Sequence, residues 1–280
     1  MQHIETREIA TDVVSALKQD LPAETDESMK DIRSLFVSGS YVRGDWLERN
    51  SDIDISVVFH SGIGNVIETD FGVRYISNQN DFEGYKRIWQ IITSAIGDRE
   101  FYSQVPGGVD IMAYPEGPES VEFIRELKGP RQFNVFLFDL LDNSQILWGE
   151  NIIAKIPSPP DYGDLVLNAF QVSAERIARL EEGAADKQRA AFLAYRAIQM
   201  AQIVFGEKTL DKRRLLYLYE KKLPEFSTKG VGSRIIRQYI GAFYPDHSPS
   251  FLDVPIYQRF YREVMGVAEK EIHAQKTCDE

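Results

Sequence analysis

The stretch that determines the fold is residues 35–59, which read LFVSGSYVRGDWLERNSDIDISVVF. Its first three residues form a short apolar run that ends in Ser38-Gly39-Ser40, a pattern that predicts a buried strand followed by a tight turn. Its last eight residues, 52–59, alternate in polarity and are rich in β-branched side chains. They predict a second strand, and this second strand carries two acidic residues.

The two acidic residues of the second strand are Asp52 and Asp54. Because they are two positions apart, their side chains project from the same face, about 7 Å apart along the chain. Ile53, Ile55 and Val57 take the opposite face, which is the face that a core needs. Two carboxylates this close repel each other unless a cation lies between them. Mg²⁺ suits this position, since it binds through one or two carboxylates together with substrate phosphates.

A third carboxylate, Asp110, lies on another predicted strand at 109–114, after the turn at 106–108. If that strand pairs beside the first acidic strand, the three carboxylates converge on one spot. Such a cluster suits displacement at phosphorus assisted by two metal ions. We therefore predict Asp52, Asp54 and Asp110 as catalytic and metal-binding residues, with two Mg²⁺ ions. The alternative for the Asp-x-Asp pair is a solvated strand face.

A phosphate-binding turn is predicted twelve residues before Asp52. Gly39 permits close approach of the backbone, and Ser40 with the amides after it is suited to hold a phosphate at a helix N-terminus. Arg43 adds a cation for a leaving pyrophosphate. Plainer roles stay open for two of them, because Ser40 also fits a helix or turn cap and Arg43 also fits a surface pair with Asp45 or Glu48.

The rest of the chain divides at a proline-rich connector at 156–161. Three prolines in four positions exclude a helix there and favour a stiff, extended link. Before it, helical spacing predicts helices at 6–19, 82–96, 119–127 and 133–141, with a further strand at 145–148. After it, the periodicity predicts helices only, at 164–182, 186–205, 210–222, 231–243 and 254–272. We predict an α+β fold: a mixed-sheet domain at 1–155, an all-helical domain at 160–272 and a tail at 273–280.

Composition excludes several classes of function. The chain has 280 residues, a formal net charge of −11 and a pI near 5.0, which argues against binding of nucleic-acid backbones. Its single cysteine, Cys278, rules out an internal disulfide and a cysteine-rich metal site. No apolar run approaches the roughly 18 residues of a membrane span, and the N-terminus lacks a signal-peptide core. We expect a cytoplasmic protein with no nucleic-acid or membrane partner.

The two quoted motifs, Gly39 to Gly44 and Asn50 to Asp54, resemble the signature of the nucleotidyltransferase superfamily that includes DNA polymerase β. The strand around Asp110 is similar to the strand that carries the third acid in that superfamily. The layout of the whole chain looks most like the aminoglycoside adenylyltransferases and related small-molecule nucleotidyltransferases. The segment with Lys208 and Lys212 resembles their C-terminal domain, which makes Lys212 a candidate triphosphate contact, although a solvated helix face explains both lysines as well.

The resemblance implies ATP as substrate, a divalent metal, and transfer of a nucleoside monophosphate with release of pyrophosphate. Asp52 and Asp54 would bind the metal, while Asp110 would be either a ligand or the base that takes the acceptor proton. Gly39, Ser40, Arg43 and Lys212 would contact the nucleotide. We expect an unidentified small-molecule acceptor that is modified on a hydroxyl. The alternatives are adenylylation of a protein partner, as in antitoxin-like members, and a non-catalytic nucleotide-binding regulatory module.

Overall fold

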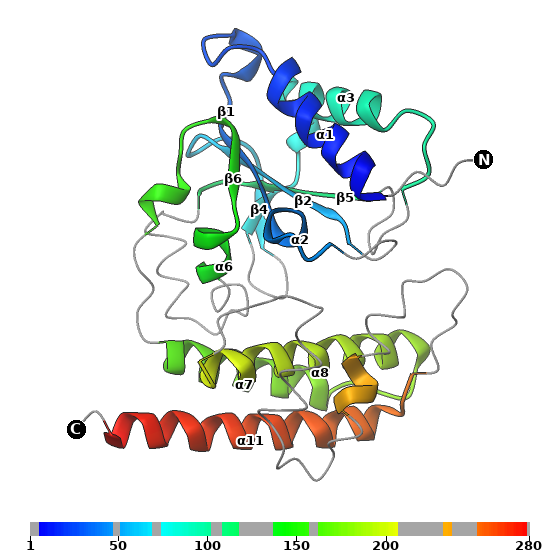
Figure 1. The fold of residues 1–280 in the computed structure, drawn as a ribbon, viewed down its shortest axis with the longest axis vertical. Helices are drawn as coiled ribbons and strands as arrows, with labels where there is room; N and C mark the ends of the chain where they lie inside the picture. Colours follow the sequence, from blue (N-terminus) through cyan, green and yellow to red (C-terminus); the bar gives the residue numbers. More distant parts are fainter. Residues whose placement is uncertain are drawn as a thin grey trace. The chain divides into compact units, whose positions relative to one another are not determined.

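A computed structural model gives the fold (Figure 1) and describes residues 6–46, 51–68, 74–101, 108–117, 137–156, 162–206, 232–236 and 251–278. The chain forms two compact units. The first comprises Met1–Arg125 and Asp139–Ser158, and the second comprises Glu126–Phe138 and Pro159–Glu280. The later division, between Ser158 and Pro159, falls inside the proline-rich stretch.

A four-stranded mixed sheet forms the centre of the first unit, in the order β5-β2-β1-β6. The strands are β1 (Ile32–Ser38), β2 (Ile53–Phe59), β5 (Val109–Tyr114) and β6 (Gln145–Gly149). β1 pairs antiparallel with both β2 and β6, whereas β2 and β5 run parallel. Both strands predicted from residues 35–59 are therefore present, and they lie side by side in the middle of the sheet.

Two helices, α1 (Thr6–Asp20) and α3 (Glu83–Ile96), lie next to each other on one face of the sheet (Figure 1). Their apolar stripes include Val13 of α1 and Ile88 of α3, and both residues are fully buried. The odd-numbered residues of β2, from Ile53 to Phe59, belong to the same core. The alternation along β2 thus turns its aliphatic side chains toward the helices.

The opposite face of the sheet carries a smaller core. Phe36 of β1 and Val58 of β2 are buried there together with Ile152, Ile153 and Ile156, which lie in and beside the short helix η4 (Ile153–Lys155). Helix α6 (Leu137–Asp142) contributes Leu140 and Leu141 to its margin. The other short elements described in the first unit are η1 (Glu27–Met29), α2 (Gly39–Arg43), β3 (Val66–Glu68), β4 (Arg74–Ile76) and η2 (Gln79–Asp81).

The described part of the second unit is helical. Its long helices are α7 (Tyr162–Ala178), α8 (Ala184–Val204) and α11 (Val254–Cys278), and each packs against the other two. Tyr261 of α11 is fully buried; its hydroxyl donates to the Phe170 carbonyl at 3.0 Å. None of the helices in the described ranges has the length and hydrophobicity needed to cross a membrane.

The predicted α+β class, with a mixed sheet followed by helices, is confirmed. Residues 273–278, expected as a tail, instead continue α11, because no helix breaker intervenes and Gln275 donates to the Val204 carbonyl of α8 at 3.0 Å. The hairpin of β3 and β4 was not predicted; its strands are only three residues long, too short for periodicity to show. The helices expected at 119–127 and 210–222 lie outside the described residues, and of that expected at 231–243 only 232–236 is described, as helix.

Candidate functional site

Three carboxylates meet at one end of the central strands. Asp54 of β2 and Asp110 of β5 are direct partners in the parallel register, and Asp52 immediately precedes β2. Each of the three offers a carboxylate oxygen, these oxygens lie within 4.8 Å of one another, and all three residues are half-buried. Parallel pairing places equivalent residues of neighbouring strands side by side, so two acids far apart in the sequence become adjacent. The predicted convergence of the three acids is thus present in the structure.

The electrostatics of this cluster favour a cation. Burial, followed by the negative charge of Asp52, raises the pKa of the Asp110 carboxyl. Burial also raises the pKa of the Tyr114 hydroxyl, and the charges of Asp110 and Asp54 add to the effect. Oxygen donors at this spacing are the ligand set that Mg²⁺ and Ca²⁺ take, with phosphate oxygens or water completing the shell. The residues present therefore fit a divalent cation.

The backbone of Gly39 lies against Asp54 of the acid cluster. It has φ +73°, in the left-handed region, and a Cβ built on it would overlap Oδ2 of Asp54. A side chain at this position would therefore displace either the carboxylate or the turn. The close backbone approach that a glycine permits is made here to an acid of the cluster, and contact of Gly39 with a nucleotide stays a prediction.

Ser40 follows within α2, and its side chain is 2% exposed. Its Oγ has no hydrogen-bond partner among the described residues, and its carbonyl accepts the Gly44 amide at 3.1 Å. The hydroxyl therefore does not cap the helix. A buried hydroxyl without a partner is costly, which makes it available for a ligand oxygen beside Gly39.

Arg43 ends α2 in a double ion pair that is nearly buried. Its Nη1 donates to Oδ2 of Asp139 at 2.5 Å, and its Nε donates to Oδ1 of Asp45 at 3.1 Å. Burial disfavours its charged form, but Asp139 and Asp45 outweigh that effect and raise the pKa of the guanidinium, with a smaller contribution from Asp54. The pair with Asp45 is one of the two roles left open by the sequence. Contact of Arg43 with a nucleotide stays a prediction.

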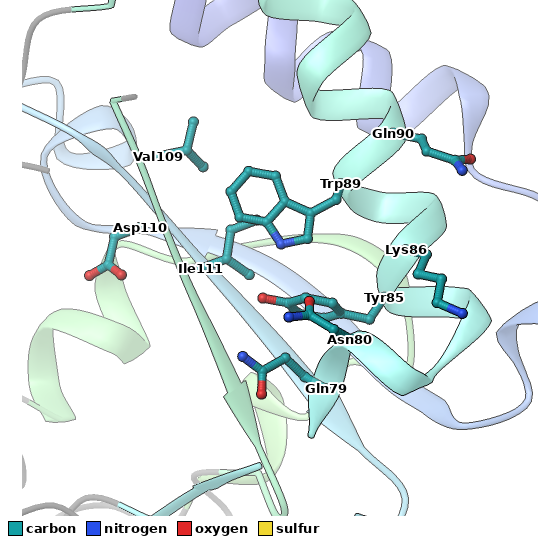
Figure 2. A pocket seen from close by; sticks show the side chains of 9 residues that line it. All are labelled: Gln79, Asn80, Tyr85, Lys86, Trp89, Gln90, Val109, Asp110 and Ile111. Atoms are coloured by element: carbon teal, nitrogen blue, oxygen red, sulfur yellow. The ribbon is translucent and has the colours of Figure 1, made fainter. Parts of the chain in front are cut away.

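An open pocket of about 740 Å³ lies beside the edge strand β5 and includes Asp110 in its wall. Figure 2 shows Trp89 and Tyr85 reaching from α3 toward Ile111, while Asp110 points away from them on the other side of the strand. Gln79 and Asn80 of η2 supply amide groups to the same wall. The pocket thus combines an aromatic surface with amides, while the Asp110 carboxylate is directed to the other side of β5.

Residues 22–94 match the family model described as a nucleotidyltransferase domain, and this stretch contains Gly39, Ser40, Asp52 and Asp54. Residues 22–94 are therefore similar to a nucleotidyltransferase domain. The enzyme class of the chain, nucleotidyltransferase, was predicted from the same motifs and is confirmed. Asp110 lies beyond the matched stretch, so its place beside Asp54 comes from the sheet alone.

The fold of this nucleotidyltransferase is similar to the crystal structure of spectinomycin adenyltransferase from Enterococcus faecialis with ATP and spectinomycin. The TM-score is 0.51 at 13% sequence identity, over 92% of this chain and 98% of that chain. At this identity the likeness concerns the fold, and it agrees with the adenylyltransferase-like layout predicted from the sequence. No curated protein sequence matches the chain.

Sequence reasoning missed one residue of this region of the nucleotidyltransferase. Asp139 is 7% exposed and binds Arg43, yet it is separated from Arg43 by 96 positions and belongs to no recognised motif. The only local signal is an acid in the apolar run of the predicted helix 133–141. Lys212, the fourth predicted nucleotide contact, lies outside the described residues.

Proposed function

We propose that this nucleotidyltransferase transfers AMP from Mg²⁺-ATP to a hydroxyl of a small molecule and releases pyrophosphate. The observation that carries the proposal is the cluster of Asp52, Asp54 and Asp110, whose oxygens lie within 4.8 Å of one another. Asp52 and Asp54 would hold the divalent cation, and Asp110 would complete the cluster as a ligand or as the base. The bound cation supplies charge neutralisation at the phosphates.

Different residues of the chain contribute to different parts of the transfer. The Ser40 hydroxyl, which has no hydrogen-bond partner among the described residues and follows the Gly39 backbone that lies against Asp54, is placed to donate to a phosphate oxygen. The acceptor oxygen forms a bond to the α-phosphorus, its proton passes to a base at or near Asp110, and the bond from the α-phosphorus to the bridging oxygen breaks as pyrophosphate leaves. Positioning and electrostatics supply most of the rate in such a reaction.

One observation supports a small acceptor and ATP. The structural neighbour, similar in fold, was solved with ATP and spectinomycin. We infer an acceptor of that general size, neutral or cationic, because the surface and the acid cluster are negatively charged.

The test is titration calorimetry with Mg²⁺-ATP on the wild type and on the double variant Asp52→Asn plus Asp54→Asn, followed by pyrophosphate release with a panel of hydroxylated and aminated small molecules. We expect wild-type binding that the double variant loses, and release with at least one acceptor. Unchanged heat in the double variant would show that the nucleotide binds elsewhere. Binding without release on any acceptor would favour a regulatory module.

A further inference from the structure

The C-terminal end of helix α2 is fixed by an ion pair between two residues that are 96 positions apart in the sequence. Arg43 is the last residue of α2, and its side chain is 12% exposed. Its partner Asp45 is only two residues away, so that contact closes a local turn. Its other partner, Asp139, belongs to α6 and joins two elements that are remote in sequence.

Asp139 is itself held in place by its own helix end. While Oδ2 accepts from Arg43, Oδ1 accepts from Asn143 Nδ2 at 2.9 Å, and the Asn143 amide donates to the Asp139 carbonyl at 2.8 Å. Both oxygens are therefore engaged, which fixes the direction of the carboxylate. A planar guanidinium that binds two buried carboxylates through different nitrogens has little freedom to turn.

The opposite end of α2 is the Gly39–Ser40 turn, packed so closely on Asp54 that no side chain fits between them. The helix is only five residues long, and the Gly44 amide closes it on the Ser40 carbonyl at 3.1 Å. A displacement of Arg43 is therefore carried to Ser40 within a single turn. The ion pair at one end thus fixes the distance between the turn and the acid cluster at the other.

We propose that Asp139 is a positioning residue, which acts through Arg43 to hold the Gly39–Ser40 turn in its position against Asp54. Its catalytic consequence rests on the proposed function, but its structural consequence does not. Loss of the Asp139 charge leaves Asp45 as the one ion-pair partner of Arg43 among the described residues, so α2 gains freedom while Asp52, Asp54 and Asp110 stay on their strands. We expect a loss of about 10–100-fold in kcat/KM, the usual range when a group that orients a site residue is removed.

The first measurement is hydrogen exchange of the amides of residues 39–44 in the wild type, Asp139→Asn and a matched control, Glu150→Gln. The asparagine keeps the size of the side chain and one acceptor oxygen, so that the fold survives. The control breaks a different ion pair of the same unit, Arg33 Nε to Glu150 Oε2 at 2.5 Å. We expect faster exchange in Asp139→Asn only. Equal exchange in all three proteins would overturn the proposal whether or not the enzyme turns over ATP.

The second measurement is a double-mutant cycle on kcat/KM for Mg²⁺-ATP with Arg43→Lys, Asp139→Asn and the combination. Lysine keeps the charge but cannot bind both carboxylates as the guanidinium does. If Asp139 acts through Arg43, each single variant lowers kcat/KM and the combination is no worse than the poorer single variant. If Arg43→Lys is impaired while Asp139→Asn stays within twofold of the wild type, Arg43 contacts the nucleotide independently and the positioning role is wrong. A wild type without Mg²⁺-ATP turnover would instead count against the proposed function. In that case hydrogen exchange would still decide whether Asp139 positions the Gly39–Ser40 turn.

Discussion

Gly39→Ala is the substitution that most directly tests the geometry of the site. At φ +73° an alanine pays a backbone penalty of about 1–2 kcal/mol, and its Cβ would overlap the Asp54 carboxylate. Relieving that overlap requires a shift of the turn or of Asp54, which adds about 1–3 kcal/mol, as in other overpacked sites. We expect a total loss of about 2–5 kcal/mol in the free energy of unfolding.

A matched control separates the two contributions. Gly62 has φ +83° in the same unit, and a Cβ built there meets no atom within 4 Å. Gly62→Ala should therefore carry the backbone penalty alone, about 1–2 kcal/mol. The difference between the two variants in urea unfolding measures the cost of moving Asp54 or the turn.

Activity provides the second readout for the same pair of variants. A displacement near 1 Å at a reacting centre costs about 100-fold in rate, so we expect Gly39→Ala to lose about that much kcat/KM for Mg²⁺-ATP. Gly62→Ala should turn over like the wild type, measured at a temperature where both variants are folded. If Gly39→Ala keeps wild-type kcat/KM, or if the two variants lose equal stability, the reasoning about Gly39 and Asp54 is refuted.

Three further predictions concern other residues of the first unit. Asp110→Asn should still bind Mg²⁺-ATP through Asp52 and Asp54 but lose at least about 100-fold in pyrophosphate release, a typical loss for a missing base; loss of binding in calorimetry would make Asp110 chiefly a ligand. Hydrogen bonds from Arg33 and then from Lys155 lower the pKa of Glu150 from 4.5 to about 2. The contribution of these contacts to the free energy of unfolding is therefore complete above pH 4.5 and is lost as the pH falls toward 2. Glu150→Gln should accordingly be less stable than the wild type at pH 7 by at most about 1 kcal/mol after solvent screening, and a difference in urea unfolding that did not shrink from pH 7 to pH 3 would contradict this. Trp46→Phe should lower the free energy of unfolding by about 1–3 kcal/mol and leave KM for Mg²⁺-ATP unchanged. The reason is that Trp46 is buried between Tyr41 and Phe101, with its Nε1 donating to Thr6. A raised KM would mean that the indole contacts the nucleotide.

Local pattern was sufficient for the elements that carry the site. The apolar run at 35–37 and the alternation at 52–59 correspond to β1 and β2, and the glycine at 39 marks a turn whose backbone lies against Asp54. These features are local because side-chain direction in a strand and left-handed φ at glycine depend on a few neighbouring residues.

Pairing and long-range partners needed the tertiary structure. The sequence places Asp110 on a strand but leaves open which strand it joins, and only the parallel register of β2 and β5 sets it beside Asp54. Asp139 looks like an ordinary acid in a helix until the fold brings it to Arg43. Arg43, predicted as a cation for pyrophosphate with a surface ion pair as the alternative, is nearly buried and pairs with Asp139 of α6 as well as with Asp45.

The sequence by itself determined the nucleotidyltransferase motifs, the α+β class and the acids that make up the cluster, because motifs and periodicity depend on neighbouring residues. The tertiary structure decided which acids come together, that the Ser40 hydroxyl is buried without a hydrogen-bond partner among the described residues, and that Arg43 is held between two carboxylates. Burial and contact depend on residues that lie far apart in the chain, and strand register and helix packing bring them together.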